Sequence, residues 1–207
     1  MRLFELDDSE RGHVTQSFEE PNIDAGARKL HEWLLSRGFE EGGAGGYAVV
    51  YFHPNRPYMI KVAKQPDKNY LAYANFARYY YQTNPLLPAI YDIWSKNDYF
   101  LVVGEKLNSA RGKVPSPFIE LTSYYLFAGV KRLAKDPNHV FSLEDLIRQM
   151  PGWRQNLKAD RQAWFENNKA NLQSIIKFIA KQGAMIDMHI GNIMMRGNEI
   201  VFTDPVA

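Results

Sequence analysis

Three polar residues near the C-terminus have the types and spacing that phosphoryl transfer requires. Asp187 precedes Asn192 by five positions, and Asp204 follows twelve positions later. In such chemistry one carboxylate accepts the proton of the attacking hydroxyl, while an amide oxygen and a second carboxylate hold magnesium ions. Transfer of a phosphoryl group depends mainly on charge and position. The residues therefore predict Asp187 as the base, and Asn192 and Asp204 as ligands of Mg²⁺ or, as the alternative, Mn²⁺.

A β-hairpin in residues 193–202 is predicted to bring these side chains together. Two short apolar runs flank a turn that contains Gly and Asn, a pattern typical of two antiparallel strands. Asn192 enters this hairpin and Asp204 leaves it, so both lie at its open end, while Asp187 lies in the preceding loop. His189 is expected to orient that loop by hydrogen bonds. The same residue types also occur in ordinary turns, which is the alternative interpretation of this segment.

A glycine-rich segment and a lysine in an apolar strand are candidate phosphate contacts upstream. Gly43, Gly45 and Gly46 lie in a turn that leads into an apolar strand containing Val50. Glycines in such a turn let backbone N–H groups approach phosphate oxygens. Lys61 lies inside the next apolar run and is predicted to bind the α- and β-phosphates of ATP. The simpler alternatives are a flexible loop for the glycines and a solvent-facing edge-strand position for Lys61.

The helix expected after Lys61 lacks the glutamate that usually pairs such a lysine. Residues 70–82 have aromatic and apolar side chains at near-helical spacing but include no Glu. Asp67 is the only acid between Lys61 and the end of this helix. Either Asp67 pairs with Lys61, or Lys61 is held by Asp204 and by the phosphates themselves.

The hinge that would bind the adenine base is predicted at Glu105 and Leu107. Two apolar runs, 90–94 and 99–103, predict strands that end just before these residues. Backbone donors and acceptors at such a hinge can bind the edge of the base.

Most of the remaining chain is predicted to be helical. Apolar side chains at helical spacing indicate helices over 118–135 and from 158 or 160 to 182. Ser142 is the expected N-cap of a shorter helix. Residues 25–37 predict another amphipathic helix, and the first 22 residues are either loosely ordered or an extension onto the small lobe.

The composition limits the function classes. The 25 basic and 23 acidic residues give a net charge of +2, which is not the charge of a dedicated nucleic-acid binder. The absence of cysteine excludes disulfides and zinc–thiolate sites. No apolar run reaches about 18 residues, so no membrane association is expected. The 207 residues suit one domain of two lobes, and no feature specifies an oligomeric state.

In this order the motifs resemble those of a known family. Their arrangement is that of a protein-kinase-like fold, and the details are similar to the early Ser/Thr protein kinase of autographivirus phages, small podoviruses that shut off host transcription. Asp-Pro-Val stands in place of Asp-Phe-Gly, and Asp-Met-His replaces a His-Arg-Asp loop, as in that family. The resemblance covers roughly residues 36–207, with 108–180 matching in position only. It is carried by residues 45–51 with 53–54, and by residues 60–62, 187–194 and 203–206.

The resemblance implies an α+β, compact two-lobed protein-kinase-like fold. Residues 1–107 would form a small antiparallel-sheet N-lobe with an N-terminal extension, the glycine-rich loop and the phosphate-binding lysine. Residues 108–207 would form a reduced, mostly helical C-lobe with the catalytic loop and the metal-binding hairpin. These residues include neither the activation segment of ordinary kinases nor the C-terminal shutoff domain of longer family members.

The resemblance also implies an activity, its cofactors and its partners. It indicates a serine/threonine protein kinase that uses ATP with Mg²⁺ in the host bacterial cytoplasm. Host proteins would be phosphorylated early in infection, with RNA polymerase and RNA-processing enzymes as target classes.

Two other functions remain open on the sequence. A small-molecule phosphotransferase of the aminoglycoside-kinase type shares the Asp187–Asn192 spacing and a metal-binding Asp, but such enzymes usually build an acidic helical pocket after that Asp, and this chain has none there. A pseudokinase that inhibits a host protein by contact is favoured by the missing helix Glu and activation segment. The presence of Lys61, Asp187, Asn192 and Asp204 argues against it.

Overall fold

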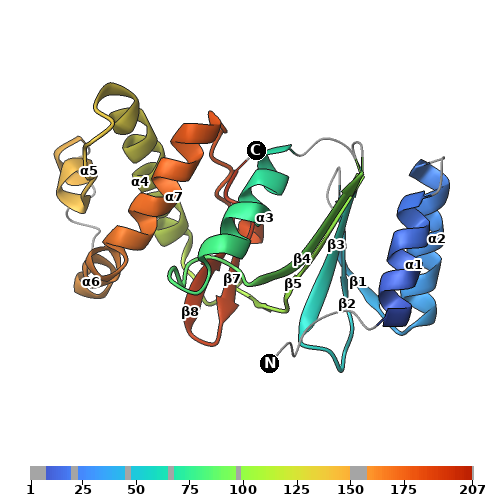
Figure 1. Ribbon diagram of the computed structural model, residues 1–207. Helices are drawn as coiled ribbons and strands as arrows, with labels where there is room; N and C mark the ends of the chain where they lie inside the picture. Colours follow the sequence, from blue (N-terminus) through green and yellow to red (C-terminus); the bar gives the residue numbers. More distant parts are fainter. Residues whose placement is uncertain are drawn as a thin grey trace. The chain divides into compact units, whose positions relative to one another are not determined.

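The computed structural model divides the chain into two units (Figure 1). An antiparallel sheet dominates the first unit and helices dominate the second, which confirms the predicted α+β class and the predicted character of the two lobes. The structure describes residues 8–19, 23–44, 48–64, 68–96, 99–149 and 158–206. The first unit comprises Met1–Tyr81 and Pro88–Lys106, and the second comprises Gln82–Leu87 and Leu107–Ala207.

The sheet of the first unit is built from short runs of β-branched and aromatic residues, which favour strands because their side chains pack well on a pleated surface. All neighbouring strands are antiparallel, in the order β1-β2-β3-β5-β4. The strands expected around Lys61 and on both sides of residues 95–98 are confirmed. The bounds of the five strands of this sheet are β1 Glu40–Ala44, β2 Ala48–Phe52, β3 Tyr58–Lys64, β4 Ile90–Lys96 and β5 Tyr99–Glu105.

Two helices, α1 (Asp8–Glu19) and α2 (Ile23–Ser36), cover one face of this sheet. Tyr51 and Ile60 bury their side chains on that face, in one cluster with Val14 of α1. Figure 1 shows both blue helices against this side of the sheet. Helix α1 is therefore an extension packed onto the small lobe, and loose order is wrong for this part of the first 22 residues.

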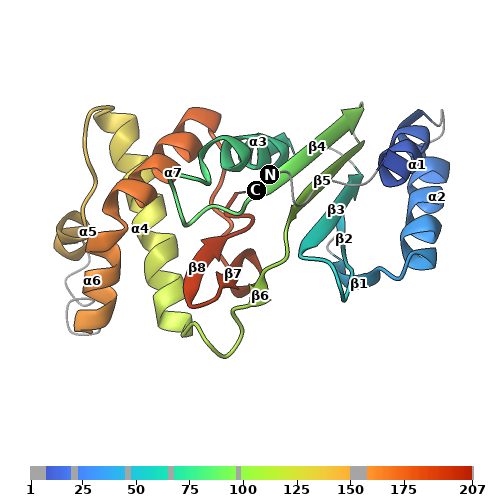
Figure 2. The same cartoon turned by 60° about the horizontal axis from the view of Figure 1, so that its bottom comes forward.

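Helix α3 (Lys68–Tyr80) lies on the opposite face of the sheet (Figures 1 and 2). Its buried Tyr70 stacks on Phe100 of β5, with ring centroids 5.8 Å apart. Ile60 and Lys61 are adjacent in β3, so their side chains point to opposite faces. Ile60 enters the core beneath α1 and α2, and Lys61 faces α3.

The second unit packs its helices around α4 and α7. Gly129 of α4 allows a close approach, because a Cβ there would lie 2.5 Å from Ile176 Cδ1 of α7. Tyr125 and Phe165 extend this core with ring centroids 5.1 Å apart. The expected helix over 118–135 is confirmed. The helices are α4 Ser116–Lys135, α5 Leu143–Gln149, α6 Ala159–Asn167 and α7 Lys169–Gln182.

A break at Asn168 separates α6 from α7. The sequence predicted one helix from 158 or 160 to 182, and that prediction is wrong. Asn168 has φ −103° and ψ 9°, and its Nδ2 donates to Trp164 O at 2.9 Å. An Asn amide competes with helical hydrogen bonding by bonding nearby backbone groups, which accounts for the break.

The predicted hairpin is confirmed as β7 (Ile193–Arg196) and β8 (Glu199–Phe202). Gly197 in its turn has φ 62°, a left-handed conformation that favours glycine. A further short strand, β6 (Asn108–Ser109), pairs with β7 and gives the sheet order β6-β7-β8.

Residues 82–87 belong to the second unit although unit 1 elements flank them in sequence. The Phe202 N–H donates to Leu86 O at 2.8 Å, and the Arg196 guanidinium donates to Pro85 O and Leu87 O at 3.0 Å each. Asn84 donates to Asn171 O at 3.1 Å and is buried. The second unit is therefore not continuous in sequence.

Candidate active site

Asn192 closes the loop that contains Asp187. It ends a short 3-10 helix, Ile190–Asn192, and its side chain is buried. Its Nδ2 donates to Asp187 O at 2.6 Å and to Asp187 Oδ2 at 3.2 Å. Because both bonds need an N–H donor, the amide nitrogen faces Asp187 and the amide oxygen lies on the other side.

His189 lies beside the Asp187 carboxylate. Its Nδ1 accepts from the Gly191 N–H at 3.0 Å, and its Nε2 is 3.6 Å from Asp187 Oδ2. In the neutral ring the accepting Nδ1 carries no proton, so Nε2–H faces the carboxylate. A Cβ on Gly191 would lie 2.7 Å from His189 Cε1, so a side chain at this position would displace the His189 ring. The sequence predicted that His189 orients the loop but assigned no role to Gly191. The only sequence signal for Gly191 was its position between His189 and Asn192.

Backbone pairing brings Asp204 to the same end of the β7–β8 hairpin. The Thr203 N–H donates to Asn192 O at 2.9 Å, and the Asp187 N–H donates to Pro205 O at 3.0 Å. The neighbours of Asp204 on both sides are thus bonded to the segments that contain the other two residues. Asp204 is half-buried, and its Oδ1 is shielded from solvent.

The oxygen atoms at this end of the hairpin fit magnesium better than zinc. Within the described residues, no group of three or more His, Cys, Asp or Glu side chains is arranged to hold a metal. Magnesium does not need such a group, because proteins often bind it with one or two carboxylates, waters and substrate phosphates. Asn192 and Asp204 supply amide and carboxylate oxygens, which suit a hard cation.

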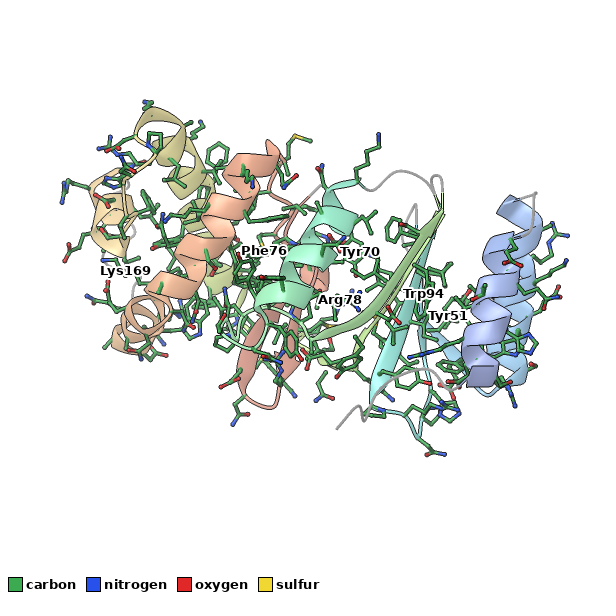
Figure 3. All side chains as sticks on the ribbon, in the orientation of Figure 1. Tyr51, Tyr70, Phe76, Arg78, Trp94 and Lys169 are labelled. Atoms are coloured by element: carbon green, nitrogen blue, oxygen red, sulfur yellow. The ribbon has the colours of Figure 1, made fainter. Side chains whose placement is uncertain are left out.

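Lys61 in the first unit lies against an aromatic ring. In the sheet it pairs with Val50 on one side and Val102 on the other. Its Nζ is 3.2 Å from the ring centroid of Tyr70, which projects from α3 in Figure 3. Asp67, the acid considered as its partner, lies outside the described residues.

The glycine-rich segment connects β1 to β2. Gly43 pairs with Val50, while Gly45 and Gly46 lie outside the described residues. Gly42 falls at a register shift between the two strands, and a Cβ there would lie 1.8 Å from a ring atom of Phe52. At least one glycine of the segment is therefore required by packing, which the sequence pattern did not reveal.

The predicted hinge is bonded to its neighbours within the first unit. The Glu105 N–H donates to Ala89 O at 2.9 Å, and Glu105 Oε1 accepts from the Ala89 N–H at 2.8 Å. The Lys106 N–H donates to Pro57 O at 2.9 Å. Leu107 is the first residue after this unit and is half-buried.

Within the described residues, no helix has both the length and the apolar character needed to cross a membrane. No curated protein matches the chain. Among solved structures, it is similar to a spectinomycin phosphotransferase crystallised with ADP and spectinomycin, with 13% identity and a TM-score of 0.37. That alignment covers 80% of this chain and spans 62% of the length of the phosphotransferase.

A comparison with protein families gives a match over nearly the whole chain. Residues 7–207 match the family described as bacteriophage T7 protein kinase 0.7. The matched region includes the second unit, all but the first six residues of the first unit, and every candidate residue described above. The chain therefore belongs to the bacteriophage T7 protein kinase 0.7 family.

Proposed function

We propose that this kinase transfers the γ-phosphoryl group of ATP to serine and threonine hydroxyls of host bacterial proteins early in infection. Its place of action is the host cytoplasm, and its target class is the transcription and RNA-processing machinery, including RNA polymerase. The observation that carries the proposal is the Asp187 carboxylate, held by Asn192 beside the segment of Asp204, in a member of a phage kinase family.

Asp187 is the proposed base that accepts the hydroxyl proton. In the described part of the chain, Asn192 and His189 both approach its Oδ2, so Oδ1 is the oxygen proposed to accept the proton. The Asp187 side chain keeps 47% exposure, which suits access by a hydroxyl of another protein. A positioned acid–base group of this kind contributes roughly 10²–10⁴-fold to the rate.

Each unit is proposed to supply its own groups for the nucleotide. Asn192 and Asp204 would hold Mg²⁺ or Mn²⁺, which neutralises charge on the β- and γ-phosphates when bound. Lys61 would bind the α- and β-phosphates, together with backbone N–H groups of Gly43, Gly45 and Gly46. Val50 would contact the adenine base. Backbone groups of Glu105 and Leu107 are proposed to bind its edge, with the N–H of Leu107 as the donor because the N–H groups of residues 105 and 106 are engaged.

The test is a phosphorylation assay with radiolabelled ATP and bacterial lysate. The wild type should label a set of host proteins on serine and threonine, as phosphoamino-acid analysis of the products would show. Asp187→Asn keeps an oxygen that can accept from Asn192 but loses the base, so labelling should fall roughly 10²–10⁴-fold with ATP affinity little changed. Asp160→Asn, an exposed acid at the start of α6, is the matched control and should label as the wild type does.

Two outcomes would contradict the proposal. Labelling by Asp187→Asn at the wild-type rate would remove Asp187 from the chemistry. Wild-type protein that binds ATP but adds no label to any protein would favour the contact inhibitor.

A further inference from the structure

We propose that Tyr70 is the positioning residue of Lys61, its ring holding the ammonium group where phosphates bind. The inference rests on the proposed function, in which Lys61 binds ATP. A kinase helix at this place usually supplies a glutamate for that purpose, but α3 contains no acidic residue.

The distance between the two groups indicates a close cation–π contact. Lys61 Nζ lies 3.2 Å from the centroid of the Tyr70 ring, well inside the limit of about 6 Å for this interaction. The other described pairs of this kind are longer, ranging from 4.3 Å for Lys131 over Phe127 to 6.0 Å for Lys106 over Phe52. The ammonium therefore sits directly against the face of the ring, where the ring quadrupole is negative.

Both partners are fixed by the structure behind them. Tyr70 is 3% exposed and stacks on the buried ring of Phe100 with an interplanar angle of 22°. Phe100 pairs with Ala63 of β3, two residues from Lys61, so the strand that supports the ring also holds the lysine. Exclusion of water strengthens a cation–π contact. A ring fixed in this way restricts the ammonium to one position above the sheet.

The ring differs from a glutamate in its effect on charge. A carboxylate would neutralise the lysine, whereas a neutral ring attracts the ammonium and leaves the pair with a net positive charge. The ring occupies one side of the ammonium, and an ammonium group has three N–H donors, so the contact with the ring does not engage all of them. The contact therefore positions a cation without placing a negative charge beside it.

The first test changes the ring and measures the dissociation constant for Mg-ATP. Tyr70→Phe keeps the ring and should stay within about twofold of the wild type, and Tyr70→Leu should weaken binding about 5- to 30-fold, which corresponds to about 1–2 kcal/mol. Phenylalanines with one, two and three fluorines at position 70 should weaken binding stepwise, because each fluorine withdraws charge from the ring face with little change in size. The same series at Tyr73, a fully buried ring of the same helix, reports the effect of fluorine on packing.

The second test needs neither nucleotide nor activity. Ring current should shift the ε-methylene proton signal of Lys61 upfield in the NMR spectrum, with Lys61→Arg used to assign that signal. Tyr70→Phe should keep the shift and Tyr70→Leu should abolish it.

These readouts separate the two proposals. A shifted Lys61 signal in a protein that phosphorylates nothing would contradict the proposed function and leave the contact in place. An active kinase with an unshifted signal, or with equal ATP affinity across the fluorinated series, would overturn the positioning role of Tyr70. The fluorinated series still decides the question if Tyr70→Leu does not fold.

Discussion

Glu10 of α1 is a carboxylate with only 1% exposure, and its partners illustrate how single residues stabilise this molecule. Glu10 Oε1 lies 2.6 Å from Arg56 Nη1, which also donates to the Tyr58 hydroxyl at 2.6 Å. The Tyr58 hydroxyl lies 3.4 Å from Glu10 Oε2. Burial, and next the Glu10 carboxylate, raise the pKa of Tyr58 to about 12, although Arg56 opposes the shift.

The Tyr58 pKa predicts a loss of stability at high pH. Its value in the unfolded chain is about 10, so between pH 10 and 12 the unfolded chain releases a proton that the folded protein keeps. The contribution of Tyr58 to the free energy of unfolding is therefore fully present below pH 10 and is lost as the pH rises through about 12. It amounts to about 3 kcal/mol at most, for a shift of about two units. Urea denaturation at pH 8, 10, 11 and 12 measures it.

Tyr58→Phe should lower the free energy of unfolding at pH 8, because it removes the hydrogen bonds of the hydroxyl. Between pH 10 and 12, however, the free energy of unfolding should fall less in this variant than in the wild type. Tyr79→Phe is the control, since Tyr79 is 80% exposed and should leave the slope unchanged. An identical slope in Tyr58→Phe and the wild type would show that Tyr58 does not titrate as stated.

Among the helices, α5 has a well-defined N-terminal cap. The Asp145 N–H donates to Ser142 Oγ at 3.2 Å, and Ser142 Oγ and N donate to Asp145 Oδ2 at 2.8 and 2.9 Å. These bonds form a reciprocal capping box with Asp in place of Glu. Burial alone would raise the pKa of Asp145, but the bonds from Ser142, together with His139, outweigh it and lower the pKa. The sequence prediction of Ser142 as N-cap is confirmed.

Ser142→Ala should lower the free energy of unfolding by about 1–2 kcal/mol, because it removes the side-chain half of this box. Urea denaturation at neutral pH measures the loss. Ser116→Ala is the matched control, because α4 begins after Pro115 with no side-chain cap, and its effect should stay within about 0.5 kcal/mol. Because the Asp145 pKa is lowered, its stabilising contribution is present above pH 3.8 and is lost as the pH falls further. Equal stability of Ser142→Ala and the wild type would contradict the capping role.

Ligand binding links the proposed metal site to the stability of the whole molecule. A ligand that binds only the folded protein stabilises it by about 2.7 kcal/mol at 100 times its dissociation constant. If Asn192 and Asp204 hold the metal, ATP with Mg²⁺ should raise the melting temperature by about 5–10 °C more than ATP with EDTA.

Asp204→Ala should abolish that magnesium-dependent difference, as measured by thermal melting. Glu199→Ala makes the same charge change at the turn end of the hairpin, paired with Arg196, and should keep the full difference. An Asp204→Ala protein with the full magnesium-dependent shift would remove Asp204 from the metal site.

Short-range patterns in the chain were enough to predict the hairpin, most helices and the proximity of the segments that contain Asp187, Asn192 and Asp204. Hairpins and amphipathic helices depend on residue spacing within one segment, and the three polar residues lie within 18 consecutive positions. Local pairing of that segment brings them together, as the bonds from Thr203 and Asp187 show.

Contacts between distant segments could not be predicted in this way. Several aromatic residues of α3 had suitable spacing, and only the packing of that helix on the sheet placed Tyr70 over Lys61. Packing likewise placed Val14 in the core of the sheet and Phe52 against Gly42. The spacing of residues within one segment indicates which face of an element is apolar. It does not indicate which side chain that face contacts, because the contacts depend on how all the elements pack together in the core.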